Sequence, residues 1–258
     1  MNSTKYKVGV ADYGMNVWEG GCFSLEKRLE TVKSCGYDGI EMLRAGNAEE
    51  FFFRAGLFRR AGMEFLSCDA SGDQELTCRA AAATKCPYVW LNCGKSTRDV
   101  PYEVWLRRAK LLMAAAAGWG VKCAIHNHLG TVIESEAEIH RVMADCPDLL
   151  LLLDVGHLGA MEGDIPGVIR RYADRLASVH LKDVLIKNPA IPMGAENWWE
   201  RLEFREFGAG NIGMDIPGAV KTLRESGYTG WLLVEQDTHR REPALDLKAN
   251  LEILRSCL

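Results

Sequence analysis

The chain has 258 residues, of which 48% are hydrophobic and 26% charged, and its formal net charge at pH 7 is −4. This weakly acidic balance argues against binding along a nucleic-acid backbone, which requires a basic surface. The apolar runs are too short to cross a bilayer, and no signal segment follows Met1. None of the 9 cysteines forms a CxxC pair, which is typical of a reduced cytoplasm. We therefore expect a cytoplasmic protein with neither a nucleic-acid nor a membrane partner.

Apolar strand-like segments alternate with amphipathic helical segments along the whole chain. We expect strands near residues 6–12, 39–43, 64–69, 88–93, 121–127, 149–154, 176–181 and 230–236. We expect helices near residues 24–35, 47–61, 74–85, 102–118, 135–145, 165–173, 216–226 and 243–256. Eight strand–helix units in succession predict an α/β fold, a parallel (β/α)8 TIM barrel that forms a single domain over residues 1–258. The competing doubly wound sheet often has a glycine-rich loop after its first strand, and residues 10–18 contain none.

One connection is much longer than the others. Residues 184–214 separate the seventh strand from the next helix, whereas such connections usually contain only a few residues. In barrels, long loops after strands lie on the catalytic face and shape substrate entry. Trp198 and Trp199 in this segment are expected either to form a lid or to cap the helix layer.

Polar side chains with the chemistry of metal ligands stand where several expected strands end. Because side chains alternate between the two faces of a strand, these groups can all point into the barrel mouth. Burying such groups is costly unless they are paired or metal-bound, so one bound divalent cation accounts for the whole set. The positions concerned are Glu41, His126, His128, Asp154, His180, Lys182 and Glu235, with Asp69 as a weaker example.

At these positions the chain resembles the xylose isomerase-like barrel superfamily, which includes sugar isomerases and epimerases, inosose dehydratase, dehydroshikimate dehydratase and endonuclease IV. The motifs that carry the resemblance are GYDGIEM (36–42), HNHLGTVIES (126–135), LLLDVGHL (151–158), SVHLKDV (178–184), FGAGNIGMDIPGAVKTLRESGYTGW (207–231) and VEQD (234–237). The resemblance implies that Asp154, His180 and Glu235 are metal ligands. The fourth ligand is normally a glutamate at the end of the fifth strand, where this chain has His126. We expect Glu134 to reach back as that ligand, with His126 as the alternative.

The resemblance also implies roles for residues around the metal, which is expected to be Mn²⁺ foremost, with Mg²⁺, Co²⁺ or Zn²⁺ as alternatives. A lowered pKa would let Lys182 act as a base, and the alternative is a fixed cation that binds substrate. The expected catalytic residues are Lys182, His128, His157 and Glu235. The expected substrate-binding residues are Glu41, Asp69 and Arg240. For Glu41 the alternative is orientation of a metal ligand, and for Arg240 it is a solvated loop position.

The chemistry that fits this site is removal of a proton next to a carbonyl, with the metal stabilising the resulting enediolate. Reprotonation gives an epimer or an aldose–ketose isomer, whereas loss of a β-hydroxyl gives a dehydrated product. We therefore predict a metal-dependent sugar or cyclitol isomerase or epimerase. The alternative is an inosose-type dehydratase, a lyase, which the HNHLGT motif favours. A non-catalytic or hetero-oligomeric metal barrel that binds a sugar derivative is a lesser alternative, and relatives suggest a homodimer or homotetramer.

Overall fold

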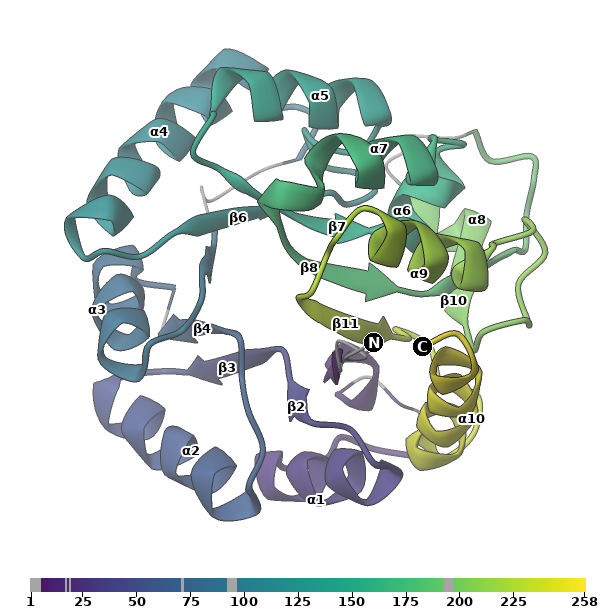
Figure 1. The fold of residues 1–258 in the computed structure, drawn as a ribbon, viewed down its shortest axis with the longest axis horizontal. Coiled ribbons are helices and arrows are strands. Elements are labelled where there is room, and N and C mark those ends of the chain that lie inside the picture. The colour runs from purple at the N-terminus through teal and green to yellow at the C-terminus, as the bar shows by residue number, and fades with distance from the viewer. Residues whose placement is uncertain (1–5, 17, 19, 71, 92–96, 193–196) are drawn as a thin grey trace.

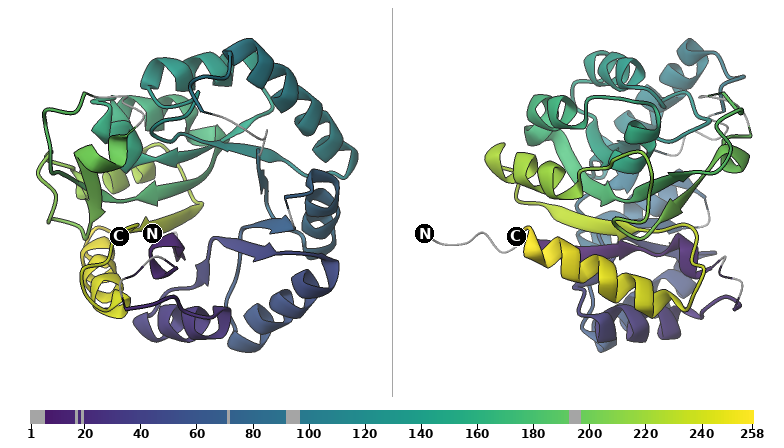
Figure 2. Two further views of the ribbon diagram at one scale, coloured as in Figure 1. Left: turned by 180° about the vertical axis from the view of Figure 1, so that it is seen from behind. Right: turned by 90° about the vertical axis from the view of Figure 1, so that its right-hand side faces the viewer.

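The computed structural model describes residues 6–16, 18, 20–70, 72–91, 97–192 and 197–258. Figure 1 shows strands arranged in a ring with helices around the outside, and Figure 2 shows the same arrangement from behind and from the side. Among the described residues, a curled sheet of seven strands with parallel pairing has the order β2 (Gly39–Ile40), β1 (Lys7–Ala11), β11 (Trp231–Glu235), β8 (Leu176–Leu181), β7 (Leu150–Asp154), β6 (Cys123–His126) and β5 (Val89–Trp90). A separate parallel pair, β3 (Met42–Ala45) and β4 (Ser67–Ala70), continues the ring. The TIM barrel fold predicted from the sequence is confirmed.

The helices that follow the strands lie within a few residues of their expected positions. Several begin at a polar residue whose side chain accepts a backbone N–H of the first turn, as at Ser24, Asn47, Asp73 and Ser135. The bounds are α1 (Leu25–Cys35), α2 (Ala48–Ala61), α3 (Gln74–Thr84), α4 (Tyr102–Gly118), α5 (Glu136–Asp145), α7 (Ile165–Tyr172), α9 (Ile216–Glu225) and α10 (Pro243–Ser256). None of the described helices is long and apolar enough to cross a membrane.

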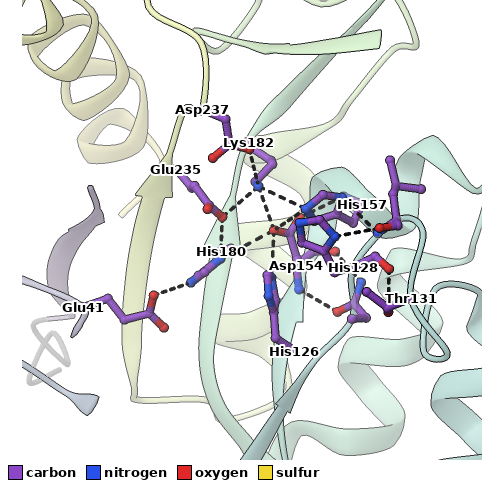
Figure 3. A network of polar contacts seen from close by, with 12 residues as sticks. Glu41, His126, His128, Thr131, Asp154, His157, His180, Lys182, Glu235 and Asp237 are labelled. Carbon is purple, nitrogen blue, oxygen red and sulfur yellow. Dashed lines mark hydrogen bonds and ion pairs between the residues drawn. The ribbon is translucent and has the colours of Figure 1, made fainter. Parts of the chain in front are cut away.

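The second strand of the barrel is interrupted at Glu41, between β2 and β3. The carbonyl oxygen of Glu41 accepts hydrogen bonds from the backbone N–H groups of Leu66, at 2.9 Å, and Ser67, at 3.0 Å. Two donors from the adjacent segment of the chain therefore face one residue, an irregularity like that of a β-bulge. Because the strand bends at this point, the Glu41 side chain is directed toward His180 inside the ring (Figure 3).

The long connection after β8 is structured. It contains β9 (Asp183–Ile186), a short helix α8 (Trp198–Arg201) and β10 (Leu202–Arg205), and β9 pairs with β10 in antiparallel fashion. The Asp183 carboxylate accepts the backbone N–H groups of Gly208 and Gly210, which holds the return of this segment against the end of β8. A further helix, α6 (Val155–Ala160), begins directly after β7 and packs its Ala160 in a buried cluster with the hairpin.

The apolar side chains form an inner cluster and an outer layer. Leu66, Tyr88, Ala124, Leu152 and Leu233 form a buried cluster inside the ring, and three of them lie two residues before polar strand ends. A larger cluster fills the space between the strands and the surrounding helices. Burial of these side chains supplies the main driving force for folding. The inner cluster also forms an apolar floor beneath the polar groups at the mouth.

Candidate active site

Four side chains at the ends of neighbouring strands converge in the barrel mouth (Figure 3). His126 ends β6, Asp154 ends β7, His180 lies in β8 and Glu235 ends β11. Each offers one ligand atom, and these four atoms lie within 4.8 Å of one another. Two carboxylates and two imidazoles at this spacing suit a divalent cation with mixed oxygen and nitrogen ligands. We call these residues the metal group.

The contacts of His180 direct one ring nitrogen toward the centre of the metal group. Its Nε2 lies 3.0 Å from Glu41 Oε2, and Glu41 Oε1 accepts the Tyr88 hydroxyl at 3.2 Å and the Trp90 indole N–H at 3.3 Å. Because Glu41 is an acceptor, Nε2 carries the hydrogen, and Nδ1 faces Glu235 Oε2 at 2.5 Å. A carboxylate that orients a histidine in this way is common behind metal ligands. Glu41, expected to bind substrate or orient a ligand, thus lies behind His180.

Two atoms at the centre of the metal group have incomplete polar contacts. His180 Nδ1 and Glu235 Oε2 are buried, and neither meets hydrogen-bond geometry with any described side chain or backbone group. Burial disfavours protonated His180, but Glu41 and Glu235 outweigh this effect and raise its pKa well above the ordinary value. A cation that binds here would displace that proton, as is usual for metal sites. The donor set, in which these two buried atoms face each other without hydrogen-bond geometry, therefore fits a divalent metal.

Lys182 adds a buried ammonium to the same group. Its Nζ lies 2.8 Å from Glu235 Oε2, 3.0 Å from Asp154 Oδ2 and 3.2 Å from Asp237 Oδ2. Burial would lower the pKa of Lys182, but the carboxylates of Asp154, Asp237 and Glu235 outweigh it and raise the pKa above its ordinary value. These carboxylates favour the ammonium over the neutral amine that a base requires, and the base role stays a prediction. Lys182 is therefore protonated in this environment, and its ammonium can donate as well as bind a substrate group.

Asp237 is a site residue that the sequence analysis did not nominate. Burial raises the pKa of Asp237 to about 7, against the opposing effect of the Lys182 ammonium. The alternation of side chains along a strand could have identified it from the sequence. Asp237 follows Glu235 by two residues in the VEQD motif and can therefore point the same way.

His128 and His157 lie side by side next to the metal group, with ring centroids 3.9 Å apart. Burial lowers the pKa of His128 to about 4 and that of His157 well below its ordinary value. Both imidazoles are therefore neutral near pH 7. His157 Nε2 lies 3.4 Å from Lys182 Nζ. The Trp198 ring is 5.5 Å from His128 and 5.9 Å from His157, so this tryptophan of the long segment covers both histidines.

The structure places Glu134 apart from the metal group, whereas His126 belongs to it. The turn after β6 folds back on itself, with the His128 N–H bonded to the Ile133 carbonyl at 2.9 Å. This turn directs the Glu134 carboxylate onto the Gly130 N–H at 3.1 Å and the Arg98 guanidinium at 3.0 Å. Arg98 and the Gly130 N–H thus hold the side chain that was expected to reach back to the metal.

The remaining nominated residues, Asp69 and Arg240, lie outside the metal group. Arg240 forms an ion pair with Glu203 of β10 at 2.5 Å. Asp69 lines a cavity of about 300 Å³ beside the metal group, in which Trp90, His126 and His128 also form part of the wall. Arg44, which the sequence analysis did not consider, lines the same cavity. A volume of this size suits a small-molecule substrate.

Comparisons with known proteins agree with this architecture. The family model of the xylose isomerase-like TIM barrel matches residues 71–257. The rhizopine catabolism protein MocC of Rhizobium meliloti is 31% identical over 61% of this chain and 50% of its own length. The inosose dehydratase of Erwinia tasmaniensis is 35% identical over 56% of this chain and 51% of its own length. The chain thus spans about half the length of the curated relatives it matches.

Solved structures resemble the whole barrel. The apo form of 3-keto-D-glucoside 4-epimerase from E. coli superposes with a TM-score of 0.72 at 15% identity, covering 98% of this chain and 100% of the other. The IolI protein with a bound zinc atom also gives a TM-score of 0.72, at 16% identity and 97% coverage of both chains. These likenesses establish the fold, and the family model matches most of the sequence. The chain therefore belongs to the xylose isomerase-like TIM barrel family.

Proposed function

We propose that this protein is a divalent-metal-dependent enzyme that removes a proton next to the carbonyl of a sugar or cyclitol and then eliminates water. The observation that carries the proposal is the contact of the Glu235 carboxylate with the Lys182 ammonium, 2.8 Å apart beside the other metal-group residues. Elimination requires a base for the carbon-bound proton and an acid for the departing hydroxyl group. Glu235 and Lys182 are such a pair. The proposal includes a cytoplasmic location and a sugar or cyclitol as the small-molecule partner.

The chain's own residues have distinct tasks in this reaction. His126, Asp154, His180 and Glu235 would hold a divalent cation, and Mn²⁺ is the ion we propose first. When bound, such an ion supplies Lewis-acid stabilisation of the negative charge that develops on the carbonyl oxygen.

Proton transfer would involve groups on this side of the barrel mouth. Glu235 accepts the proton from the carbon next to the carbonyl. Lys182 donates a proton to the β-hydroxyl as its bond to carbon breaks, so that water leaves. The neutral imidazole of His157, 3.4 Å from Lys182 Nζ, is placed to exchange a proton with this ammonium.

Isomerisation or epimerisation, which the sequence analysis placed first, is the second candidate. The observation that favours it is His128, whose neutral imidazole lines the cavity and can supply a second proton-transfer group. Epimerisation requires proton transfer on both faces of the substrate carbon. The glutamate expected for that second role, Glu134, instead contacts Arg98 and the Gly130 N–H. This position of Glu134 is the reason that we propose dehydration first. A non-catalytic or hetero-oligomeric metal barrel remains the lesser alternative.

Metal removal and product analysis test the proposal. We expect chelation to abolish turnover of an inosose, and we expect Mn²⁺ to restore it most fully among Mn²⁺, Mg²⁺, Co²⁺ and Zn²⁺. Dehydration in deuterated water produces an unsaturated or diketone product that mass spectrometry detects as loss of one water. An isomer of unchanged composition that has gained deuterium would identify the second candidate. A chain that binds no metal, or that keeps full turnover after chelation, would refute the metal dependence that both candidate reactions share.

The identity of the fourth ligand has its own test. His126→Ala is expected to weaken Mn²⁺ binding by more than about tenfold, because loss of a direct ligand exceeds the effect of changing a residue behind it. Glu134→Gln should leave metal affinity within about twofold of the wild type. Equilibrium dialysis measures both affinities, and His140→Ala on α5 is the matched histidine control. Normal affinity in His126→Ala with weak binding in Glu134→Gln would make Glu134 the ligand.

A further inference from the structure

We propose that Arg44 and Asp69 form a subsite that binds hydroxyl groups of a neutral, unphosphorylated polyol. The inference rests on the proposed function, because it places the reacting end of the substrate at the metal group. Arg44 and Asp69, on the cavity wall formed by β3 and β4, would bind the hydroxyl groups farthest from the metal group and would favour neutral over phosphorylated substrates.

The cavity connects the metal group with this wall. It has a volume of about 300 Å³, and His126, one of the metal-group residues, lines it together with Trp90, Arg44 and Asp69. A molecule in the cavity therefore meets the imidazole of His126 and the two charged side chains of β3 and β4. The volume suits a monosaccharide or a cyclitol better than a long chain.

Arg44 and Asp69 have opposite charges and, toward the described residues, free hydrogen-bonding capacity. They are directly registered partners on β3 and β4, yet they form no ion pair with each other in the described structure. Among the described residues, Arg44 meets a charged group only at 4.0 Å, at Asp12, which Arg28 already contacts at 2.5 Å. One oxygen of Asp69 accepts the Gly72 N–H at 2.9 Å, and the other has no partner among the described residues.

This pair matches the chemistry of neighbouring hydroxyl groups. A hydroxyl group both donates and accepts, so one can donate to the Asp69 carboxylate while the next accepts from the Arg44 guanidinium. Hydrogen bonds to a charged partner are stronger than those between neutral groups. A donor and an acceptor side by side therefore bind two adjacent hydroxyl groups of a polyol.

Trp90 provides a fixed apolar surface between this pair and the metal group. Its indole N–H donates to Glu41 Oε1 at 3.3 Å, and its ring lies 4.8 Å from that of His126. The hydrogen bond holds the ring in place. The C–H face of a carbon ring can pack on such a surface while its hydroxyl groups point to the polar wall.

The charges of the described residues around the cavity disfavour an anionic substrate. Arg44 is the single lysine or arginine among the described residues that line the cavity. A phosphate group there would face the Asp69 carboxylate and lie near Asp12. The N-terminus of α3 also borders the cavity, but Asp73 caps it by accepting the Leu76 N–H. That carboxylate occupies the end of the helix where an anion would otherwise bind.

Calorimetric titration of the Mn²⁺-loaded protein tests the subsite. The probes are 2-keto-myo-inositol and its phosphate monoester. We expect the wild type to bind the neutral ketone at least about tenfold more tightly than the ester. Asp69→Asn and Arg44→Gln should each weaken binding of the neutral ketone by about ten- to a hundredfold, the effect of losing one hydrogen bond to a charged group. Asn at position 69 can still accept the Gly72 N–H, so the local turn is kept.

Arg59→Gln, at the end of α2 and outside the cavity, is the matched control and should bind like the wild type. Wild-type affinity in both cavity variants, tighter binding of the ester, or no binding of the neutral ketone would overturn the subsite. Turnover is measured on the same samples. Binding that weakens in the two cavity variants without any turnover in the wild type would support the subsite and contradict the proposed reaction.

Discussion

Asp154→Ala is expected to abolish Mn²⁺ binding and to lower turnover by about a thousandfold or more, the scale of lost metal-ion catalysis. Asp154 Oδ2 is 3.2 Å from His126 Nε2 and 3.5 Å from His180 Nδ1, so it contacts two other members of the metal group. Lys182 and neighbouring imidazoles hold the pKa of this buried carboxyl well below its ordinary value, despite the opposing effect of burial. Its negative charge is therefore available to a metal across the physiological pH range.

The same substitution also removes a helix cap, and a control variant separates the two effects. Asp154 Oδ1 accepts the His157 N–H at 2.8 Å at the start of α6, and loss of such a cap costs about 1 kcal/mol. Asp164→Ala removes an equivalent cap from α7, where Asp164 Oδ1 accepts the Gly167 N–H at 2.9 Å. We expect Asp164→Ala to lower thermal stability slightly and to bind Mn²⁺ normally. Metal titration followed by calorimetry measures both, and normal Mn²⁺ affinity in Asp154→Ala would remove this residue from the proposed site.

The barrel and the direction of its strand-end side chains could be predicted from local sequence. Alternation along a strand places Asp154 on the face of Leu152 and Glu235 on that of Leu233, and both leucines lie in the inner cluster. Each of these predictions needs only the spacing of residues within one strand. The hairpin of β9 and β10 was missed because local sequence does not show the contacts that hold this segment, such as those of Asp183 with glycines more than twenty residues away.

The surroundings of the site depended on contacts between distant residues, which local sequence does not reveal. The position of Glu134 follows from the turn after β6 and from Arg98, which is 36 residues away in the chain. The charge state of Lys182 depends on three carboxylates that come from two other strand ends. The lone motif HNHLGT therefore could not decide between His126 and Glu134 as a ligand. The assignment of metal and catalytic roles stays a prediction for the variants to test.

Lys182→Met is expected to lose most of its turnover while the protein still binds Mn²⁺. The methionine side chain has similar length and no charge, so it removes the proposed proton donor without leaving a large cavity. General acid catalysis typically contributes about 10²–10⁴-fold to a rate, and we expect a loss in that range. Lys221→Met on the exposed surface of α9 is the matched control and should leave turnover unchanged.

Metal affinity and stability distinguish this catalytic role from a structural one. Lys182 Nζ contacts Asp154 Oδ2 and Glu235 Oε2, two oxygens that a metal would use. Its removal leaves buried carboxylates without their cation, which should destabilise the metal-free protein by about 3–5 kcal/mol. Mn²⁺ then has no ammonium to compete with, so it should bind the variant at least as tightly as the wild type and raise its melting temperature more. A variant with wild-type turnover would refute the acid role. A variant that loses Mn²⁺ binding would show that Lys182 supports the metal group instead, because the ammonium would then hold the ligands in place rather than compete with the ion.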